Sequence, residues 1–211
     1  MWVIMPVKAF KDAKLRLTGV LSPTQRAHLS FLMLDDILLT LSTSPDVQGI
    51  TLISSDKSVE ELARRYQSEF LLTDLDRGYS QDAHRGVISV GDRNIDTVAI
   101  IPSDVPYLSH EDLAQLNLLH NNGMTICPAV VDGGTNALLF TPPLQVQLQF
   151  GVDSLRKYQN AAELANIPIQ LKQIPGLEHD IDRPEDLHWF QAQTSGAEAW
   201  SYMRDIKIRE H

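Results

Sequence analysis

The stretch Thr97-Val98-Ala99-Ile100-Ile101-Pro102-Ser103-Asp104-Val105-Pro106 joins a nearly continuous apolar run to a carboxylate that stands between two prolines. A run of this kind is expected of a central parallel strand whose two faces are both covered. Similar apolar runs alternate with amphipathic helix patterns from one end of the chain to the other. This alternation predicts a three-layer α/β domain with a mostly parallel sheet.

The length of 211 residues and the hydrophobic content of 43% suit a single domain with one good-sized core. We place this domain at residues 1–193 and treat residues 194–211 as a C-terminal extension. The extension is more polar but carries Trp200 and Tyr202. Two interpretations of it are open: a terminal helix packed on the domain, or a segment that binds a partner.

The net charge of −9 argues against nucleic acid or an anionic membrane as the main partner. The apolar runs fall well short of the roughly 20 residues that a membrane-spanning helix needs. The chain has a single cysteine, Cys127, which excludes an intrachain disulfide and fits a reducing compartment. We therefore expect a cytoplasmic protein and leave its oligomeric state open, a homodimer included.

Four cations follow the apolar run at residues 2–7, and in a parallel α/β sheet ligands bind beyond the carboxyl ends of the strands. They are Lys8, Lys11, Lys14 and Arg16. They suit either a phosphate-binding loop or the solvated face of a helix. A basic cluster directly after a first strand is unusual in an acidic protein, which favours the phosphate-binding loop. The sequence of the loop does not match a Walker motif.

Two aspartates are candidates for a magnesium site, because Mg²⁺ prefers carboxylate oxygens together with substrate phosphates. Asp104 is stiffly placed between Pro102 and Pro106, and it is either a metal ligand or a turn-forming residue. Asp182 precedes a helix pattern near the end of the chain. It is either a second metal ligand or a helix N-cap, with Glu185 closing a capping box.

The string Gly133-Gly134-Thr135-Asn136 lies between two apolar runs, at residues 124–131 and 137–141. Both runs are expected to be strands, and the pair adds an antiparallel element to the sheet. Adjacent glycines allow a tight turn and a close approach of a ligand to the backbone. The string is interpreted as a hairpin turn, as a polar lip that holds a small anion, or as both at once.

Gly151 and Ser154 stand before another helix pattern, where backbone amides and a hydroxyl can meet an anion at the positive helix end. The alternative is an ordinary serine N-cap that follows a loop glycine. Each of these signals is weak alone. Together, a basic loop, two carboxylates and a polar lip suit phosphoryl or nucleotidyl transfer, in which positioning and charge neutralisation do most of the work.

Four motifs occur in the order seen in the guanylyltransferases of coenzyme F420 biosynthesis, and the chain resembles this family over about residues 3–190. They are Pro102-Ser103-Asp104-Val105-Pro106, Gly133-Gly134-Thr135-Asn136-Ala137-Leu138-Leu139, Phe150-Gly151-Val152-Asp153-Ser154 and Asp180-Ile181-Asp182-Arg183-Pro184-Glu185-Asp186-Leu187. The second of these strings is the most specific. The start of the chain, Pro6-Val7-Lys8 and Ala13-Lys14-Leu15-Arg16-Leu17, also looks like theirs.

The resemblance implies a nucleotide-diphospho-sugar-transferase-like, Rossmann-like fold and an enzyme that condenses GTP with a three-carbon phospho-acid. The products would be a GDP-linked acid and pyrophosphate. Members of the family use 2-phospho-L-lactate, phosphoenolpyruvate or 3-phospho-D-glycerate. The attacking phosphate is already anionic, so no residue is assigned as a general base.

The resemblance also assigns site residues by their positions in these motifs. Mg²⁺ is the implied cofactor, with Asp104 and Asp182 as its ligands. The triphosphate of GTP would face Lys8, Lys14 and Arg16. The phospho-acid would be held by Thr135, Gly151 and Ser154.

One departure from the family is Gly78-Tyr79-Ser80, where Gly-Leu-Asn is usual before the helix that lines the pocket. Tyr is bulkier than Leu and Ser is shorter than Asn, so the identity of the acid is left open. Two other functions fit parts of the pattern. A nucleotidyltransferase for a sugar phosphate or molybdopterin usually has a glycine-rich first loop, whereas residues 8–17 contain no glycine. A non-catalytic nucleotide-binding protein would not need both Asp104 and Asp182.

Overall fold

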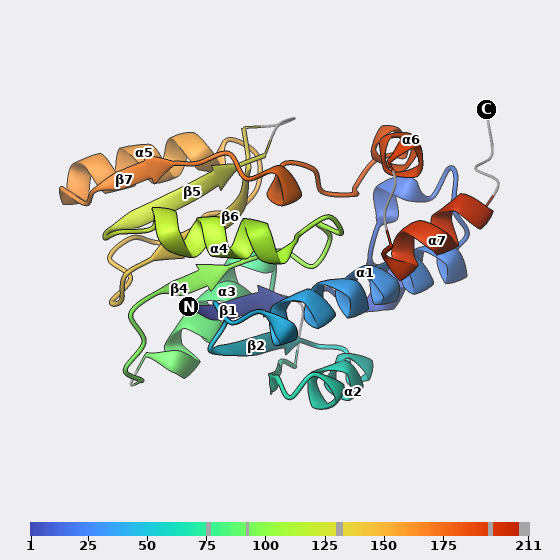
Figure 1. The fold of residues 1–211 in the computed structure, drawn as a ribbon, viewed down its shortest axis with the longest axis horizontal. Helices are drawn as coiled ribbons and strands as arrows, with labels where there is room; N and C mark the ends of the chain where they lie inside the picture. Colours follow the sequence, from blue (N-terminus) through green and yellow to red (C-terminus); the bar gives the residue numbers. More distant parts are fainter. Residues whose placement is uncertain (75–76, 92, 130–132, 194–195, 207–211) are drawn as a thin grey trace.

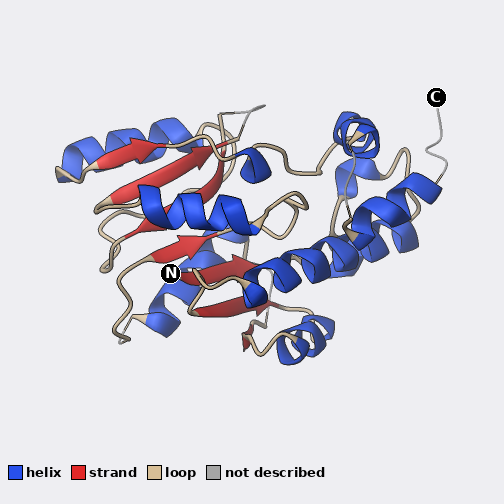
Figure 2. Cartoon of the chain, viewed as in Figure 1, coloured by secondary structure: helices blue, strands red, loops and turns tan. Residues whose placement is uncertain are grey.

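The computed structural model describes residues 1–74, 77–91, 93–129, 133–193 and 196–206. In this part of the chain, seven strands form one sheet with helices on both faces (Figures 1 and 2). The strand order is β3-β2-β1-β4-β6-β5-β7. The strands are β1 (Trp2–Pro6), β2 (Gly49–Ser54), β3 (Glu69–Leu72), β4 (Val98–Ile100), β5 (Met124–Pro128), β6 (Thr135–Phe140) and β7 (Ile169–Leu171).

The sheet is mixed, with one strand running against its neighbours. β1 lies parallel to β2 and to β4, whereas β6 is antiparallel to both β4 and β5. The pairing of Ile100 with Leu138 places the start of β6 beside the loop that follows β4. The predicted α/β class and its antiparallel element are therefore confirmed.

The two strands of the antiparallel pair differ from prediction at their inner ends. β5 ends at Pro128, and residues 130–131 of the predicted strand lie outside the described residues. β6 begins at Thr135 rather than at Ala137, because Thr135 already pairs with Pro128 across a register shift. Thr135 is therefore the first residue of a strand and not part of a two-residue Gly-Gly turn.

The helices alternate with the strands along the chain. They are α1 (Pro23–Thr43), α2 (Ser58–Arg65), α3 (Tyr79–Val90), α4 (His110–Leu119), α5 (Ser154–Ala165), α6 (Pro184–Ala192) and α7 (Glu198–Asp205), with short 3-10 turns η1 (Phe10–Asp12), η2 (Leu15–Leu17) and η3 (Pro175–Leu177). α1 begins where Ser22 and Gln25 form a reciprocal capping box around Pro23. Among the described helices, none has the length and apolar character that crossing a membrane requires.

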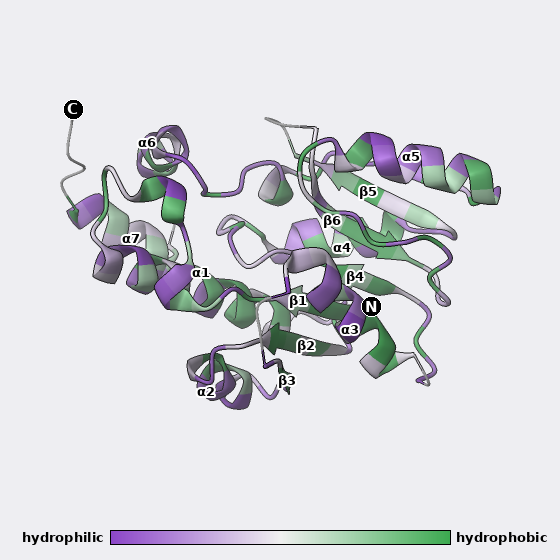
Figure 3. Cartoon of the chain, turned by 180° about the vertical axis from the view of Figure 1, so that it is seen from behind, coloured by the Kyte–Doolittle hydropathy of each residue, from purple (hydrophilic) through white to green (hydrophobic). Residues whose placement is uncertain are grey.

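The central strands are buried on both faces, as the apolar run at residues 97–101 predicts. Ala99 and Ile101 belong to the cluster under α1, α2 and α4, whereas Val98 and Ile100 belong to the cluster under α3 and α5. Successive side chains of a strand point to opposite faces, so an uninterrupted apolar run fills both clusters. Figure 3 shows the strands as a mostly hydrophobic layer between helices with polar outer surfaces.

A third cluster of apolar residues forms a helical lobe beyond the carboxyl end of β1. The first half of α1, η2, α6 and α7 pack there around buried residues that include Leu29, Ile181 and Phe190 (Figure 1). α7 is anchored by Asp36, whose carboxylate accepts hydrogen bonds from the backbone of Glu198 and Ala199, both at 2.9 Å. The described part of the C-terminal extension is thus a terminal helix packed on the domain, while the predicted boundary at residue 193 stays a prediction.

Candidate active site

Three separate segments meet between the sheet and the helical lobe. They are the basic loop at residues 8–17 after β1, the loop at residues 102–106 after β4, and the segment at residues 178–183 before α6. The backbone N–H of Ile181 donates a hydrogen bond to the carbonyl of Asp104 at 3.1 Å. This bond joins the last two segments and brings their carboxylates together.

The carboxylate cluster consists of Asp104, Asp180 and Asp182. One oxygen from each lies within 4.8 Å of the others, and all three side chains are half-buried. Asp104 and Asp182 are predicted from the sequence, whereas Asp180 is not. The spacing of Asp180 and Asp182 could have indicated Asp180. Ile181 between them is fully buried in the helical lobe, and in an extended segment the side chains on either side of a residue point to the face opposite its own.

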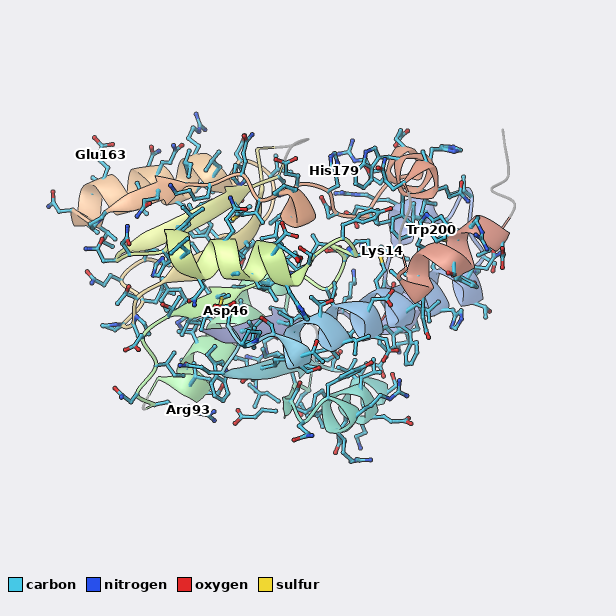
Figure 4. All side chains as sticks on the ribbon, in the orientation of Figure 1. Lys14, Asp46, Arg93, Glu163, His179 and Trp200 are labelled. Atoms are coloured by element: carbon cyan, nitrogen blue, oxygen red, sulfur yellow. The ribbon has the colours of Figure 1, made fainter. Side chains whose placement is uncertain are left out.

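Lys14 lies inside this cluster. Its Nζ contacts Asp104 Oδ2 at 2.5 Å and Asp182 Oδ1 at 3.1 Å, and its side chain is only 7% exposed. Lys14 adopts a left-handed conformation, with φ of +54°, between the short turns η1 and η2. The loop is therefore not a continuous helix, and for Lys14 the interpretation as a solvated helical face is wrong. In Figure 4, Lys14 lies between the sheet and the helical lobe.

The other cations of the loop are more open to solvent. Arg16 Nη1 contacts Asp182 Oδ2 at 2.9 Å, and the Arg16 side chain is 59% exposed. Lys8 is exposed and lines the second of the two cavities described below. Lys11 is also exposed but lines neither cavity.

The protonation of the cluster follows from burial and from these ion pairs. Burial alone would lower the pKa of Lys14, but the charges of Asp104 and Asp182 outweigh it and raise the pKa. Burial opposes ionisation of Asp182, yet Lys14 and Arg16 hold its pKa below the usual range. Burial, followed by the charge of Asp104, raises the pKa of Asp180 to about 6. The cluster sets three carboxylates against the two cations Lys14 and Arg16.

Two cavities meet at the carboxylate cluster and share part of its wall. The first has a volume of about 570 Å³ and the second a volume of about 360 Å³. Arg16, Tyr79, Pro102, Asp104 and Asp182 line both. The first cavity extends to Arg77, Thr135 and Gly151, and the second extends to Lys8, Phe10 and Ser30.

The far wall of the first cavity is formed by the predicted polar lip. Thr135 and Gly151 line the cavity, and the space beside the Gly151 Cα is open where a Cβ would stand. Ser154 is fully buried, and its Oγ donates a hydrogen bond to Thr135 Oγ1 at 2.9 Å. The structure thus brings all three residues together, with Ser154 behind Thr135 rather than at the surface.

Two of the N-cap interpretations are wrong. α5 begins at Ser154 with Asp153, at φ of +57°, in the N-cap position, so Ser154 is already helical. α6 is preceded by Arg183, and the carboxylate that accepts from the backbone of Asp182 and Arg183 belongs to Asp186, not to Glu185. The side chain of Asp182 is therefore left to bind Lys14 and Arg16.

The Gly78-Tyr79-Ser80 segment lies at the start of α3 and reaches the site. Gly78 has φ of +91° and precedes the helix, which turns Tyr79 into the wall between the two cavities. Ser80 Oγ accepts a hydrogen bond from the backbone N–H of Phe150 at 2.9 Å. Arg77 and Phe150 also line the first cavity, and neither is singled out as a site residue by the sequence.

The sequence profile of a family described as "Guanylyl transferase CofC like" matches residues 1–210. This chain belongs to the CofC-like guanylyltransferase family. A family relative from Roseiflexus sp. (strain RS-1), named phosphoenolpyruvate guanylyltransferase, is 37% identical over 198 residues, which cover 93% of this chain and 87% of the relative.

Other CofC-like relatives carry the names of different acids. A 3-phospho-D-glycerate guanylyltransferase from Colwellia psychrerythraea is 27% identical, covering 88% of both chains. A 2-phospho-L-lactate guanylyltransferase from Methanobrevibacter smithii is 28% identical, covering 97% of this chain and 90% of the relative.

The fold is also found in a solved structure with low sequence identity. A putative nucleotide-diphospho-sugar transferase from Desulfovibrio desulfuricans G20 superposes with a TM-score of 0.78, at 18% identity, covering 97% of this chain and 94% of that one. The predicted nucleotide-diphospho-sugar-transferase-like fold is thereby confirmed.

Proposed function

We propose that this chain condenses GTP with a three-carbon phospho-acid to give a GDP-linked acid and pyrophosphate, in the biosynthesis of coenzyme F420. The observation that carries the proposal is the carboxylate cluster, tied to Lys14 and Arg16, at the junction of two cavities. Family membership supports it over a sugar-phosphate or molybdopterin nucleotidyltransferase. The names of the relatives give the candidate acids: phosphoenolpyruvate, 3-phospho-D-glycerate and 2-phospho-L-lactate.

The charges of the two cavities suggest which substrate each one binds. Lys8, Lys14 and Arg16 line the second cavity and suit the triphosphate of GTP. Away from Arg16 and the carboxylate cluster, the first cavity combines Arg77 with the neutral groups of Thr135 and Gly151, which suits an acid that carries one phosphate and one carboxylate. The two substrates would then meet at the wall that both cavities share.

The carboxylate cluster fits Mg²⁺ by the chemistry of its donors. Mg²⁺ takes hard oxygen ligands, commonly one or two carboxylates together with phosphates and water. Asp104, Asp180 and Asp182 offer three such oxygens within 4.8 Å of one another. When bound by these residues, the ion would neutralise phosphate charge during the transfer.

The reaction then needs alignment more than proton transfer. An oxygen of the acid's phosphate forms a bond to the α-phosphorus of GTP, while the bond from that phosphorus to the β-phosphate oxygen breaks. Pyrophosphate leaves with the electron pair. The attacking group is already anionic, so the chain's task is to place both anions and to offset their repulsion. Lys14 assists by holding Asp104 and Asp182, from two separate loops, at one fixed spacing.

The proposal is tested by incubating the protein with GTP and Mg²⁺ and adding each of the three acids in turn. We expect pyrophosphate release that depends on one of the acids, together with a product whose mass equals that of a GDP-linked acid. GTP binding in calorimetry without release of pyrophosphate with any acid would contradict the proposal. Such a result would favour a non-catalytic nucleotide-binding protein.

A further inference from the structure

Tyr79 occupies an unusual place in the wall between the two cavities. The other polar residues of that shared wall are Arg16, Asp104 and Asp182, and all of them are charged and paired in ion contacts. Tyr79 adds a neutral phenol to the same wall. It stands where the proposed acid and nucleotide would meet, and the proposed function gives it no role so far.

The ring of Tyr79 is held independently of its hydroxyl. It packs edge-on against Phe150, with ring centroids 4.8 Å apart, and Phe150 packs in turn on Tyr158 at 5.7 Å. The hydrogen bond from the Phe150 backbone to Ser80 Oγ links the same two segments. Removing the hydroxyl alone should therefore leave the ring and the cavity wall in place.

The hydroxyl itself has an unused capacity to donate. The Tyr79 side chain is half-buried and lines both cavities, and among the described residues no hydrogen bond of its hydroxyl is seen. Burial raises the pKa of Tyr79 well above 10, and the nearby charge of Asp104 raises it further. The phenol is therefore protonated at neutral pH, and its O–H is available as a donor to a ligand in either cavity.

We propose that the Tyr79 hydroxyl donates a hydrogen bond to a non-bridging oxygen of the phosphoryl group under transfer, which makes Tyr79 a catalytic residue. The inference rests on the proposed function. No proton changes hands: the O–H bond stays intact while the acid's oxygen bonds to the α-phosphorus and pyrophosphate departs. A fixed donor aimed at developing charge stabilises the transition state more than the ground state.

The test is the variant Tyr79→Phe, assayed for pyrophosphate release. We expect kcat to fall by about 10²- to 10³-fold, because removing one such donor costs on that order. The KM values for GTP and for the acid should stay within about threefold of wild type, and the thermal midpoint should not change. Tyr79→Leu removes the ring as well, so it should add a rise in the acid's KM through the loss of packing on Phe150.

The matched control is Tyr202→Phe, because Tyr202 lies on α7 and lines neither cavity. This variant should keep the kcat of wild type. A kcat for Tyr79→Phe within about twofold of the control, or a loss expressed only in KM, would overturn the inference while leaving the proposed function intact. Absence of pyrophosphate release by the wild-type protein would instead overturn both.

Discussion

The carboxylate cluster and the Thr135 wall face the same first cavity but are held in different ways. Asp104 and Asp182 are fixed by ion pairs to Lys14, whereas Thr135 is fixed by a neutral hydrogen bond from the buried Ser154. We call the carboxylate cluster with Lys14 the charged wall, and Thr135 with Ser154 the neutral wall. The charged wall can neutralise phosphates of any origin, whereas the neutral wall contacts a substrate through its shape and hydrogen bonds. We therefore propose that the carboxylate cluster serves general phosphate chemistry and that the Thr135 wall recognises the acid.

The largest effect is expected from Asp104→Asn on the charged wall. The change removes one of three carboxylates and should lower kcat by at least about 10²-fold, because a metal ligand and its charge are lost. Pyrophosphate release measures this effect. Asp205→Asn, on a side chain that is 78% exposed on α7, is the control and should match wild type. A rate for Asp104→Asn near that of the control would reject Asp104 as a ligand.

Lys14→Met tests whether an internal cation holds the charged wall together. The variant leaves Asp104 and Asp182 without their shared partner, which should cost about 1–3 kcal/mol of stability, given that both carboxylates are partly exposed. Chemical denaturation measures the loss, with the exposed Lys57→Met as the control. Added Mg²⁺ should restore more stability to Lys14→Met than it adds to wild type. Equal gains in the two proteins would separate Lys14 from the metal site.

Thr135→Ala probes the neutral wall. The acid's KM should rise by about tenfold and the KM of GTP should stay nearly unchanged, because Thr135 lines the first cavity and not the second. Ser154→Ala should shift the acid's KM in the same direction by a smaller factor, since Ser154 acts through Thr135. Equal effects of Thr135→Ala on both KM values would contradict the division between the walls.

The smallest effect concerns Asp180 and pH. Its pKa is raised to about 6, so the folded state binds a proton more readily than the unfolded state, and stability falls as pH rises from about 4 through 6. Asp180→Asn should remove this loss. In the absence of Mg²⁺, we compare the free energy of unfolding of the variant with that of wild type. The variant's advantage should be larger at pH 7 than at pH 5 by on the order of 1 kcal/mol, or about 2–4 °C in thermal midpoint. An equal stability difference between variant and wild type at both pH values would contradict the raised pKa of Asp180.

The sequence predicted the charged wall better than it predicted the neutral one. Asp104 could be foreseen because carboxylates beyond strand ends share one edge of a sheet, whereas Asp182 was singled out by its place before a helix pattern and by the resemblance to the family. Their link through Lys14 could not be foreseen. It joins Lys14 to two carboxylates that lie 90 and 168 positions further along the chain, and it depends on the left-handed conformation of Lys14. Asp180 escaped prediction because its alignment with Asp182 requires the intervening Ile181 to be buried in the helical lobe.

The neutral wall depended on strand ends and helix starts, which the pattern placed less well. Thr135 had looked like the lip of a turn, yet it opens β6 and pairs with Pro128. Ser154 carries a hydroxyl that could contact an anion, but the start of α5 buries it behind Thr135. The alternation of strands and helices was predicted correctly, because the apolar periodicity reflects burial on the two faces of the sheet.

The proposed function requires the charged wall and the neutral wall to bring GTP and a three-carbon phospho-acid together for condensation. Its most direct test is a mass measurement of the product formed from GTP, Mg²⁺ and each acid, run in parallel on wild type and Asp104→Asn. We expect a GDP-linked acid and an equal amount of pyrophosphate from wild type with one of the acids, and almost none from the variant. GTP left intact by the wild-type protein with all three acids would contradict the proposed function.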